Sequence, residues 1–133
     1  MNISATESFV ILYHEDMQAA RQFYEVGLGL KLREVTYEWF VGYYISDKHE
    51  MTLCISTSPE ERARWGSDGK GVVVDFVVPN VDEAYQQLLR GGIKFEEPPT
   101  NQPWGLRTAS LRDPAGYTLT ITSYIPKRPP AKG

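Results

Sequence analysis

The sequence contains an internal repeat, and this repeat restricts the fold more than any other feature. Each half shows a strand, a helix that ends at glycines, and three further strands. Phe9 in the first half corresponds to Val73 in the second, 64 positions later, and Ala20 corresponds to Ala84 at the same separation. A four-stranded sheet covered by one helix leaves its other face open. The repeat therefore predicts an α+β fold of two βαβββ modules that form a curved mixed sheet around a ligand cleft.

The repeat also sets the domain organisation of the 133-residue chain, which is long enough for one ordinary domain. We expect a first module at about 7–57, a linker at 58–70 that ends in glycines, and a second module at about 71–125. The basic, proline-rich segment 126–133 is expected to be a loose tail.

Hydrophobic spacing places the elements of the first module. Asp16 is expected to be the N-cap of a helix that ends at Gly27-Leu-Gly29. In the linker, Ser58 is expected to cap one helical turn that begins with Pro59. The predicted strands lie at 9–13, 30–35, 37–45 and 51–56.

The second module shows the same order. We expect a helix that opens at 79–82 and ends at Gly91-Gly92, followed by a loop at 97–103. A hairpin at 104–122 turns at Asp113-Pro-Ala-Gly116, whose Asp, Pro and Gly occupy the positions that a type I turn prefers. The other predicted strands lie at 72–78 and 93–95.

The last strand has two chemically different faces. Leu119 and Ile121 alternate with Thr118, Thr120 and Thr122. Successive side chains of a strand point to opposite faces of a sheet. We therefore expect an apolar face against a helix and a hydroxyl-lined face toward the cleft.

Composition excludes several classes of partner. The net charge is −3 and no basic stripe is present, which argues against nucleic acid. No apolar run approaches the roughly 20 residues that span a bilayer, and the N-terminus lacks a secretory signal pattern. The single cysteine, Cys54, allows no internal disulfide and is expected to be a small buried residue. These observations predict a cytoplasmic protein without membrane or nucleic-acid partners.

A set of short motifs resembles a known superfamily. In this order and spacing, from about Phe9 to Tyr124, they are similar to the vicinal oxygen chelate proteins, which include glyoxalase I, extradiol dioxygenases, and fosfomycin and bleomycin resistance proteins. The resemblance implies paired βαβββ modules and a homodimer. The motifs are Asp16-Met-Gln-Ala-Ala-Arg-Gln-Phe-Tyr24, Gly27-Leu-Gly-Leu30, Val81-Asp-Glu-Ala-Tyr85, Gly91-Gly92, Pro103-Trp-Gly105, Arg107 and Asp113-Pro-Ala-Gly116.

The same resemblance bears on metal binding. Catalytic members hold a divalent metal with four side chains, usually His, Glu or Gln, two from each module. In this sequence the four matching positions are Phe9, Cys54, Val73 and Thr120. This set cannot hold a hard divalent ion, so we expect no metal and no cofactor. The two histidines, His14 and His49, share no ligand spacing with each other or with an acidic cluster, and are expected to be ordinary surface residues.

Strand alternation then predicts the residues that line the cleft. For the strand at 37–45, either the face of Trp39 and Tyr43 or that of Phe40 and Tyr44 could do so, and we prefer the former. The predicted ligand-binding residues are Tyr13, Trp39, Tyr43, Asp75, Trp104, Thr118 and Thr120.

Asp75 interrupts an otherwise apolar strand, Val72-Val-Val-Asp-Phe-Val-Val78. A buried carboxylate needs a partner or a proton. Three roles stay open: a structural partner of an arginine, tyrosine or hydroxyl group, an anchor for a ligand, or a general base.

Two functions follow from these predictions. The first is a metal-free small-molecule binding protein, closest to the bleomycin-resistance branch, that sequesters a drug-like, aromatic or cationic compound. Antibiotic resistance would be one such role. The alternative is a glyoxalase-like lyase, isomerase or dioxygenase with an atypical metal site or with metal-free acid–base chemistry at Asp75. An adaptor domain without a ligand fits the hydroxyl-lined strand less well.

Overall fold

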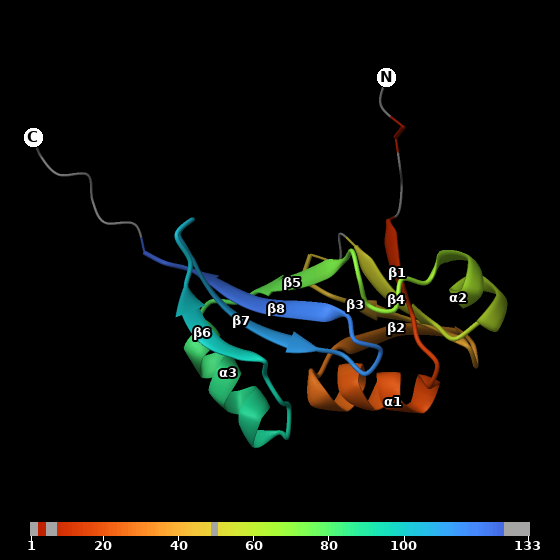
Figure 1. Cartoon of the computed structure of the whole chain (residues 1–133), viewed down its shortest axis with the longest axis horizontal. Helices are drawn as coiled ribbons and strands as arrows, with labels where there is room; N and C mark the ends of the chain where they lie inside the picture. The colour runs from red at the N-terminus through yellow and green to blue at the C-terminus, as the bar shows by residue number, and fades with distance from the viewer. Residues whose placement is uncertain (1–2, 5–7, 49–50, 127–133) are drawn as a thin grey trace, which may run out of the picture. The chain divides into compact units, whose positions relative to one another are not determined.

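Two four-stranded sheets make up the fold, and each carries a helix against one face (Figure 1). This computed structural model describes residues 3–4, 8–48 and 51–126, so His49 and residues 127–133 of the expected tail lie outside the described part. The chain divides into two compact units. Unit 1 contains Met1–Val73 and Arg112–Thr118, and unit 2 contains Val74–Leu111 and Leu119–Gly133. No helix among the described residues is long and apolar enough to cross a membrane.

The first sheet lies in unit 1 and has the strand order β1-β4-β3-β2. β1 runs parallel to β4, and the remaining neighbours are antiparallel. The prediction of a single strand at 37–45 is wrong at its start. The chain turns at Glu38 and Trp39, so Tyr37 ends one strand and Phe40 begins the next. The elements are β1 (Phe9–Tyr13), α1 (Met17–Arg21), the π-helical η1 (Gln22–Gly27), β2 (Lys31–Tyr37), β3 (Phe40–Tyr44), β4 (Thr52–Ser56) and α2 (Pro59–Trp65).

The helix starts predicted at Asp16 in the first module and at Ser58 in the linker are both confirmed. The side chain of Asp16 accepts a hydrogen bond from the Ala19 amide at 3.1 Å, and Ser58 accepts one from the Glu61 amide at 3.3 Å. Each bond satisfies an amide that has no partner inside the first helical turn.

The core of unit 1 lies between its sheet and the continuous segment of α1 and η1. Leu12, Leu53 and Ile55 are fully buried on neighbouring strands. Tyr24 of η1 stacks on Tyr43 of β3 with 5.8 Å between ring centroids. This packing defines which face of the sheet is covered, and it leaves the opposite face to the alternate residues of each strand.

The second sheet has the order β5-β8-β7-β6. Its sixth strand corrects two expectations: 93–95 is not a strand, and the expected loop at 97–103 contains one. Pro98 and Pro99 fit there because β6 is an edge strand, where a missing amide donor is tolerated. The elements are β5 (Val73–Val77), α3 (Val81–Arg90), β6 (Glu97–Asn101), β7 (Leu106–Arg112) and β8 (Thr118–Tyr124).

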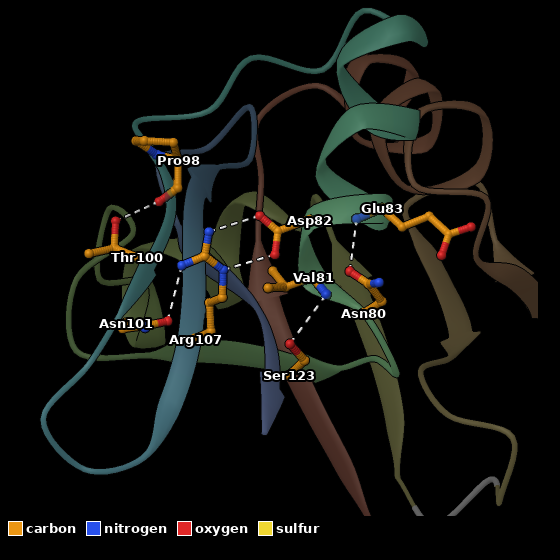
Figure 2. Close-up of polar contacts among 9 residues, drawn as sticks. All are labelled: Asn80, Val81, Asp82, Glu83, Pro98, Thr100, Asn101, Arg107 and Ser123. Atoms are coloured by element: carbon orange, nitrogen blue, oxygen red, sulfur yellow. Dashed lines mark hydrogen bonds and ion pairs between the residues drawn. The ribbon is translucent and has the colours of Figure 1, made fainter. Parts of the chain in front are cut away.

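Two backbone amides at the start of α3 find side-chain partners (Figure 2). Asn80 is the N-cap and accepts a hydrogen bond from the Glu83 amide at 3.1 Å. The Val81 amide donates to the hydroxyl of Ser123 in β8 at 3.3 Å. The second bond ties the helix start to the sheet that it covers.

Arg107 adds a second tie between this helix and the sheet (Figure 2). Its guanidinium group donates two hydrogen bonds to Asp82, at 2.8 and 2.9 Å, and one to Asn101 at 3.0 Å. These bonds hold the pKa of Asp82 below its ordinary value. The forked contact gives Arg107 a structural role in unit 2.

Candidate functional site

The most distinctive polar arrangement in unit 2 is a carboxylate held by hydroxyl groups. Thr120 and Thr122 of β8 each donate a hydrogen bond to the same oxygen of Asp75, Oδ1, at 2.7 Å. Thr122 uses its only hydroxyl hydrogen in that bond, so Thr108 is the donor in the 3.1 Å contact between the two threonines. Within the described residues Oδ2 of Asp75 has no partner. The carboxylate is therefore oriented by the strand beside it and keeps one oxygen available.

The surroundings of Asp75 are apolar and open. Val73 and Val77, two residues away on either side, are 61% and 56% exposed, whereas Val74 is buried. Asp75 itself is exposed, so it does not meet the desolvation cost expected for an acid inside the core. Its partners are hydroxyl groups, one of the three classes considered for a structural role, and the free Oδ2 leaves the anchor role open.

Cys54 lies on the face of the first sheet opposite the helix and is fully buried. Burial raises the pKa of its thiol to about 11, and Glu34 adds to the rise while Arg33 opposes it. The thiol is therefore protonated at neutral pH and is neither a nucleophile nor a ready metal ligand. The guanidinium group of Arg33 lies 5.7 Å from the ring centre of Phe9 on the same sheet.

The four positions that match the metal ligands of catalytic relatives can now be tested by their chemistry. The side chains of Phe9 and Val73 have no atom that can coordinate a metal ion. Cys54 holds its proton, and the hydroxyl group of Thr120 donates to Asp75. In the described ranges no group of three or more His, Cys, Asp or Glu side chains is placed to hold a metal ion. These residues do not fit a divalent metal.

The aromatic candidates are distributed differently from expectation. Tyr43 is fully buried against Tyr24, on the helix-covered face of β3, so the preference for its face was wrong. Alternation places Phe40 and Tyr44 on the other face. Trp39 lies in the turn between β2 and β3, is 39% exposed, and stacks on Tyr37 with 4.9 Å between centroids.

The remaining candidates lie in separate places. Tyr13 lines a cavity of about 370 Å³ within unit 1. Trp104 is 69% exposed in the segment before β7, and Thr118 is half-buried at the start of β8. That these residues and Trp39 converge with Asp75 in one cleft stays a prediction.

Sequence reasoning missed a buried pair in unit 1. His14, expected at the surface, is 2% exposed, and its Nε2 lies 2.9 Å from Oδ2 of Asp113. The same oxygen accepts a hydrogen bond from the Tyr24 hydroxyl at 2.6 Å, and Oδ1 accepts from the amides of Ala115 and Tyr117. Burial, with Asp113 second, raises the pKa of Tyr24. The turn motif identified Asp113 as a turn residue, but no local signal pointed to its distant partners.

Solved structures of similar fold were found by comparison. A glyoxalase/bleomycin resistance protein/dioxygenase from Nocardioides matches with a TM-score of 0.77 and 21% identity, over 100% of this chain and 92% of that one. A lactoylglutathione lyase from Agrobacterium tumefaciens matches with a TM-score of 0.72 and 24% identity, over 92% and 95% of the two chains. A glyoxalase-related enzyme from Fulvimarina pelagi has a TM-score of 0.72 and 16% identity, over 87% and 86%. At these identities the likeness establishes the fold alone.

Sequence comparison gives the family. No curated protein matches the sequence significantly. The model of the glyoxalase/bleomycin resistance protein/dioxygenase superfamily matches residues 8–121, which is most of the chain and includes both βαβββ repeats. The protein therefore belongs to the glyoxalase/bleomycin resistance protein/dioxygenase superfamily.

Proposed function

We propose that this chain is a small-molecule binding protein that holds its ligand without a metal, with Asp75 as the polar anchor. One observation carries the proposal: Thr120 and Thr122 hold one carboxylate oxygen of Asp75 and leave the other without a partner in the described chain. A group that is oriented before binding loses little conformational freedom when the ligand arrives.

The chemistry around Asp75 indicates the class of ligand. An ionised carboxylate only accepts hydrogen bonds, and it binds charged N–H donors most strongly. The exposed side chains of Val73 and Val77 offer apolar contact on both sides. An aromatic or aliphatic body with a cationic nitrogen would satisfy both features, as in many drugs and metabolites. Sequestration of such a compound, as in antibiotic resistance, is the role that we propose.

The four inherited ligand positions support binding without a metal. The thiol of Cys54 remains protonated at neutral pH, and Phe9 and Val73 offer no donor atom. The alternative is catalysis, either at Asp75 or at a metal site built from other residues. Metal analysis and a binding screen distinguish it from metal-free binding. From the family resemblance we further propose a cytoplasmic homodimer.

The experiment combines metal analysis with a binding screen. Elemental analysis of the purified protein is expected to show metal far below one equivalent, and divalent metals are expected to leave its melting temperature unchanged. Aromatic and aliphatic amines are then screened for thermal stabilisation. Compounds that bind at Asp75 are expected to stabilise the wild type and Asp47→Asn equally, and Asp75→Asn less. Asp47 is the matched control because it is also an exposed aspartate.

Two results would overturn the proposal. One is a tightly held stoichiometric metal, which would favour the enzyme alternative. The other is equal stabilisation of the wild type and Asp75→Asn by every compound, which would place the ligand elsewhere. Turnover of a stabilising compound that is lost with Asp75 would replace sequestration by acid–base catalysis.

A further inference from the structure

A second candidate site lies wholly within unit 1. A cavity of about 370 Å³ is lined by the end of β1, the start of α1, part of α2 and the turn that follows Asp113. Its volume is at the small end of the range for ligand pockets. It contains none of the β5 and β8 residues that surround Asp75, so it is independent of the proposed function.

The charges around this cavity are unbalanced. Three carboxylates, from Glu15, Asp16 and Asp68, line it together with one guanidinium group, from Arg62. Arg62 is paired with Glu15, and Asp16 uses one oxygen to cap α1. Asp68 has no hydrogen bond or ion pair within the described residues. The excess negative charge favours a cation.

The cavity wall also contains a buried imidazole with unused hydrogen-bonding capacity. The side chain of His14 is 1% exposed. Its Nε2 lies 2.9 Å from Oδ2 of Asp113, at ion-pair distance but outside hydrogen-bond geometry, and Nδ1 has no partner among the described residues. Tyr117 stacks on the ring at 5.8 Å and holds it in place. Because Nε2 faces Asp113, the ring nitrogen that remains for a ligand is Nδ1.

The loop that carries Asp68 is held against the turn after Asp113. A side-chain carbon on Gly69 would lie 2.5 Å from the carbonyl oxygen of Gly116, so only glycine permits this approach. Asp68 has a φ of +53°, in the left-handed region that asparagine adopts as readily as aspartate. Its carboxylate is thus presented at the cavity by a close backbone contact, and Asp68→Asn removes the charge without disturbing the backbone.

We propose that this cavity binds the primary ammonium group of a small amine, with Asp68 and His14 as acceptors. An ammonium group has three donors, no acceptor and a positive charge, which matches a carboxylate and the lone pair of Nδ1. Arg62 remains paired with Glu15, and its positive charge limits how many cations the cavity can hold. A bound amine would give Nδ1 of His14 a hydrogen-bond donor.

The test is a titration of the isotope-labelled protein with ethylammonium chloride, followed by nuclear magnetic resonance at constant ionic strength. Tetramethylammonium is the matched probe, because it has the same charge and no N–H donor. We expect ethylammonium to shift the His14 ring nitrogens and the Ala19 and Ala115 amides saturably, and tetramethylammonium to leave them unchanged. His49→Gln assigns the ring signals, since the chain has two histidines.

Two variants complete the design. Asp68→Asn is expected to weaken ethylammonium binding about tenfold, the loss typical of one charge-assisted hydrogen bond. Asp47→Asn removes the same charge from an exposed site that does not line the cavity, and is expected to bind like the wild type. Equal shifts with both cations, shifts that never saturate, or equal affinities of Asp68→Asn and the wild type would each overturn the proposal. These outcomes leave the Asp75 proposal open, because its test compares the wild type with Asp75→Asn, and this cavity is the same in both proteins.

Discussion

Asp113 and Asp75 are both aspartates that accept short hydrogen bonds from hydroxyl groups, but their surroundings differ. Asp113 in unit 1 is 5% exposed, and both of its oxygens are occupied by the Tyr24 hydroxyl, two backbone amides and the contact with His14. Asp75 in unit 2 is exposed, and its two hydroxyl partners share a single oxygen.

The difference separates a structural carboxylate from a candidate binding carboxylate. Taking a charge out of water is costly unless the charge is paired and hydrogen-bonded, and both oxygens of Asp113 accept hydrogen bonds from groups of its own chain. Asp75 remains in contact with water and needs only enough bonds to orient it. Free acceptor capacity, combined with orientation, is what makes Asp75 available to a ligand.

The largest expected effect on stability concerns Asp113, the structural carboxylate of the comparison. Asp113→Asn is expected to lower the free energy of unfolding by about 3 kcal/mol, because its amide group would place N–H donors against the Tyr24 hydroxyl and His14. Asp75→Asn is the control, with an expected change below about 0.5 kcal/mol. Urea unfolding measures both. Equal losses in the two variants would contradict the assignment of separate roles.

A second prediction concerns the pH dependence of stability that comes from the buried Cys54 thiol in unit 1. Its pKa is raised to about 11 in the folded state but returns to roughly 8.5 on unfolding. The folded state therefore binds more protons between these values. The stabilisation from Cys54 is complete below the unfolded pKa and is lost as the pH rises toward 11, by about 2 to 3 kcal/mol.

Urea unfolding of the wild type and Cys54→Ala between neutral pH and pH 11 tests this dependence. Tyr24 and Tyr43 also have raised pKa values, so both proteins should lose stability at high pH. The wild type should lose more, by the amount that belongs to the thiol. If the unfolding free energies of the two proteins fell equally with pH, burial would not raise the pKa of the Cys54 thiol.

The smallest expected effects on stability concern Thr120 and Thr122, the two threonines that donate to Asp75. Thr122 is 1% exposed and bonds to both Asp75 and Thr108, so Thr122→Val is expected to cost about 1 kcal/mol of unfolding free energy. Thr120 is half-buried and makes one bond, and Thr120→Val is expected to cost about 0.5 kcal/mol. Thermal and urea unfolding compare them. A larger loss for Thr120→Val would mean that Asp75 contributes to folding more than its exposure suggests.

Much of the architecture could be predicted from the sequence because it depends on local patterns. The N-caps Asp16 and Ser58 are signalled by residue types within one helical turn of the bonds that they make. The alternation of Thr120 with Leu119 and Ile121 set the two faces of β8, and Leu119 and Ile121 are buried as that pattern requires. The repeated βαβββ order followed from the same local signals, twice over.

Other features were decided by tertiary structure. An aromatic strand does not reveal which of its faces meets a helix, and the stacking of Tyr43 on Tyr24 decided it. Pro98 and Pro99 favoured a loop by local rules, but an edge position lets them stand in β6.

The sequence by itself determined the repeat, the helix starts, the turn at Asp113 and the chemistry missing from the four ligand positions, since each depends on the identity of residues and their spacing. Only the tertiary structure decided that His14 is buried beside Asp113 and that Asp75 keeps a free oxygen between two threonines. These contacts join residues from distant parts of the chain. Their existence depends on how elements pack, which no local pattern records.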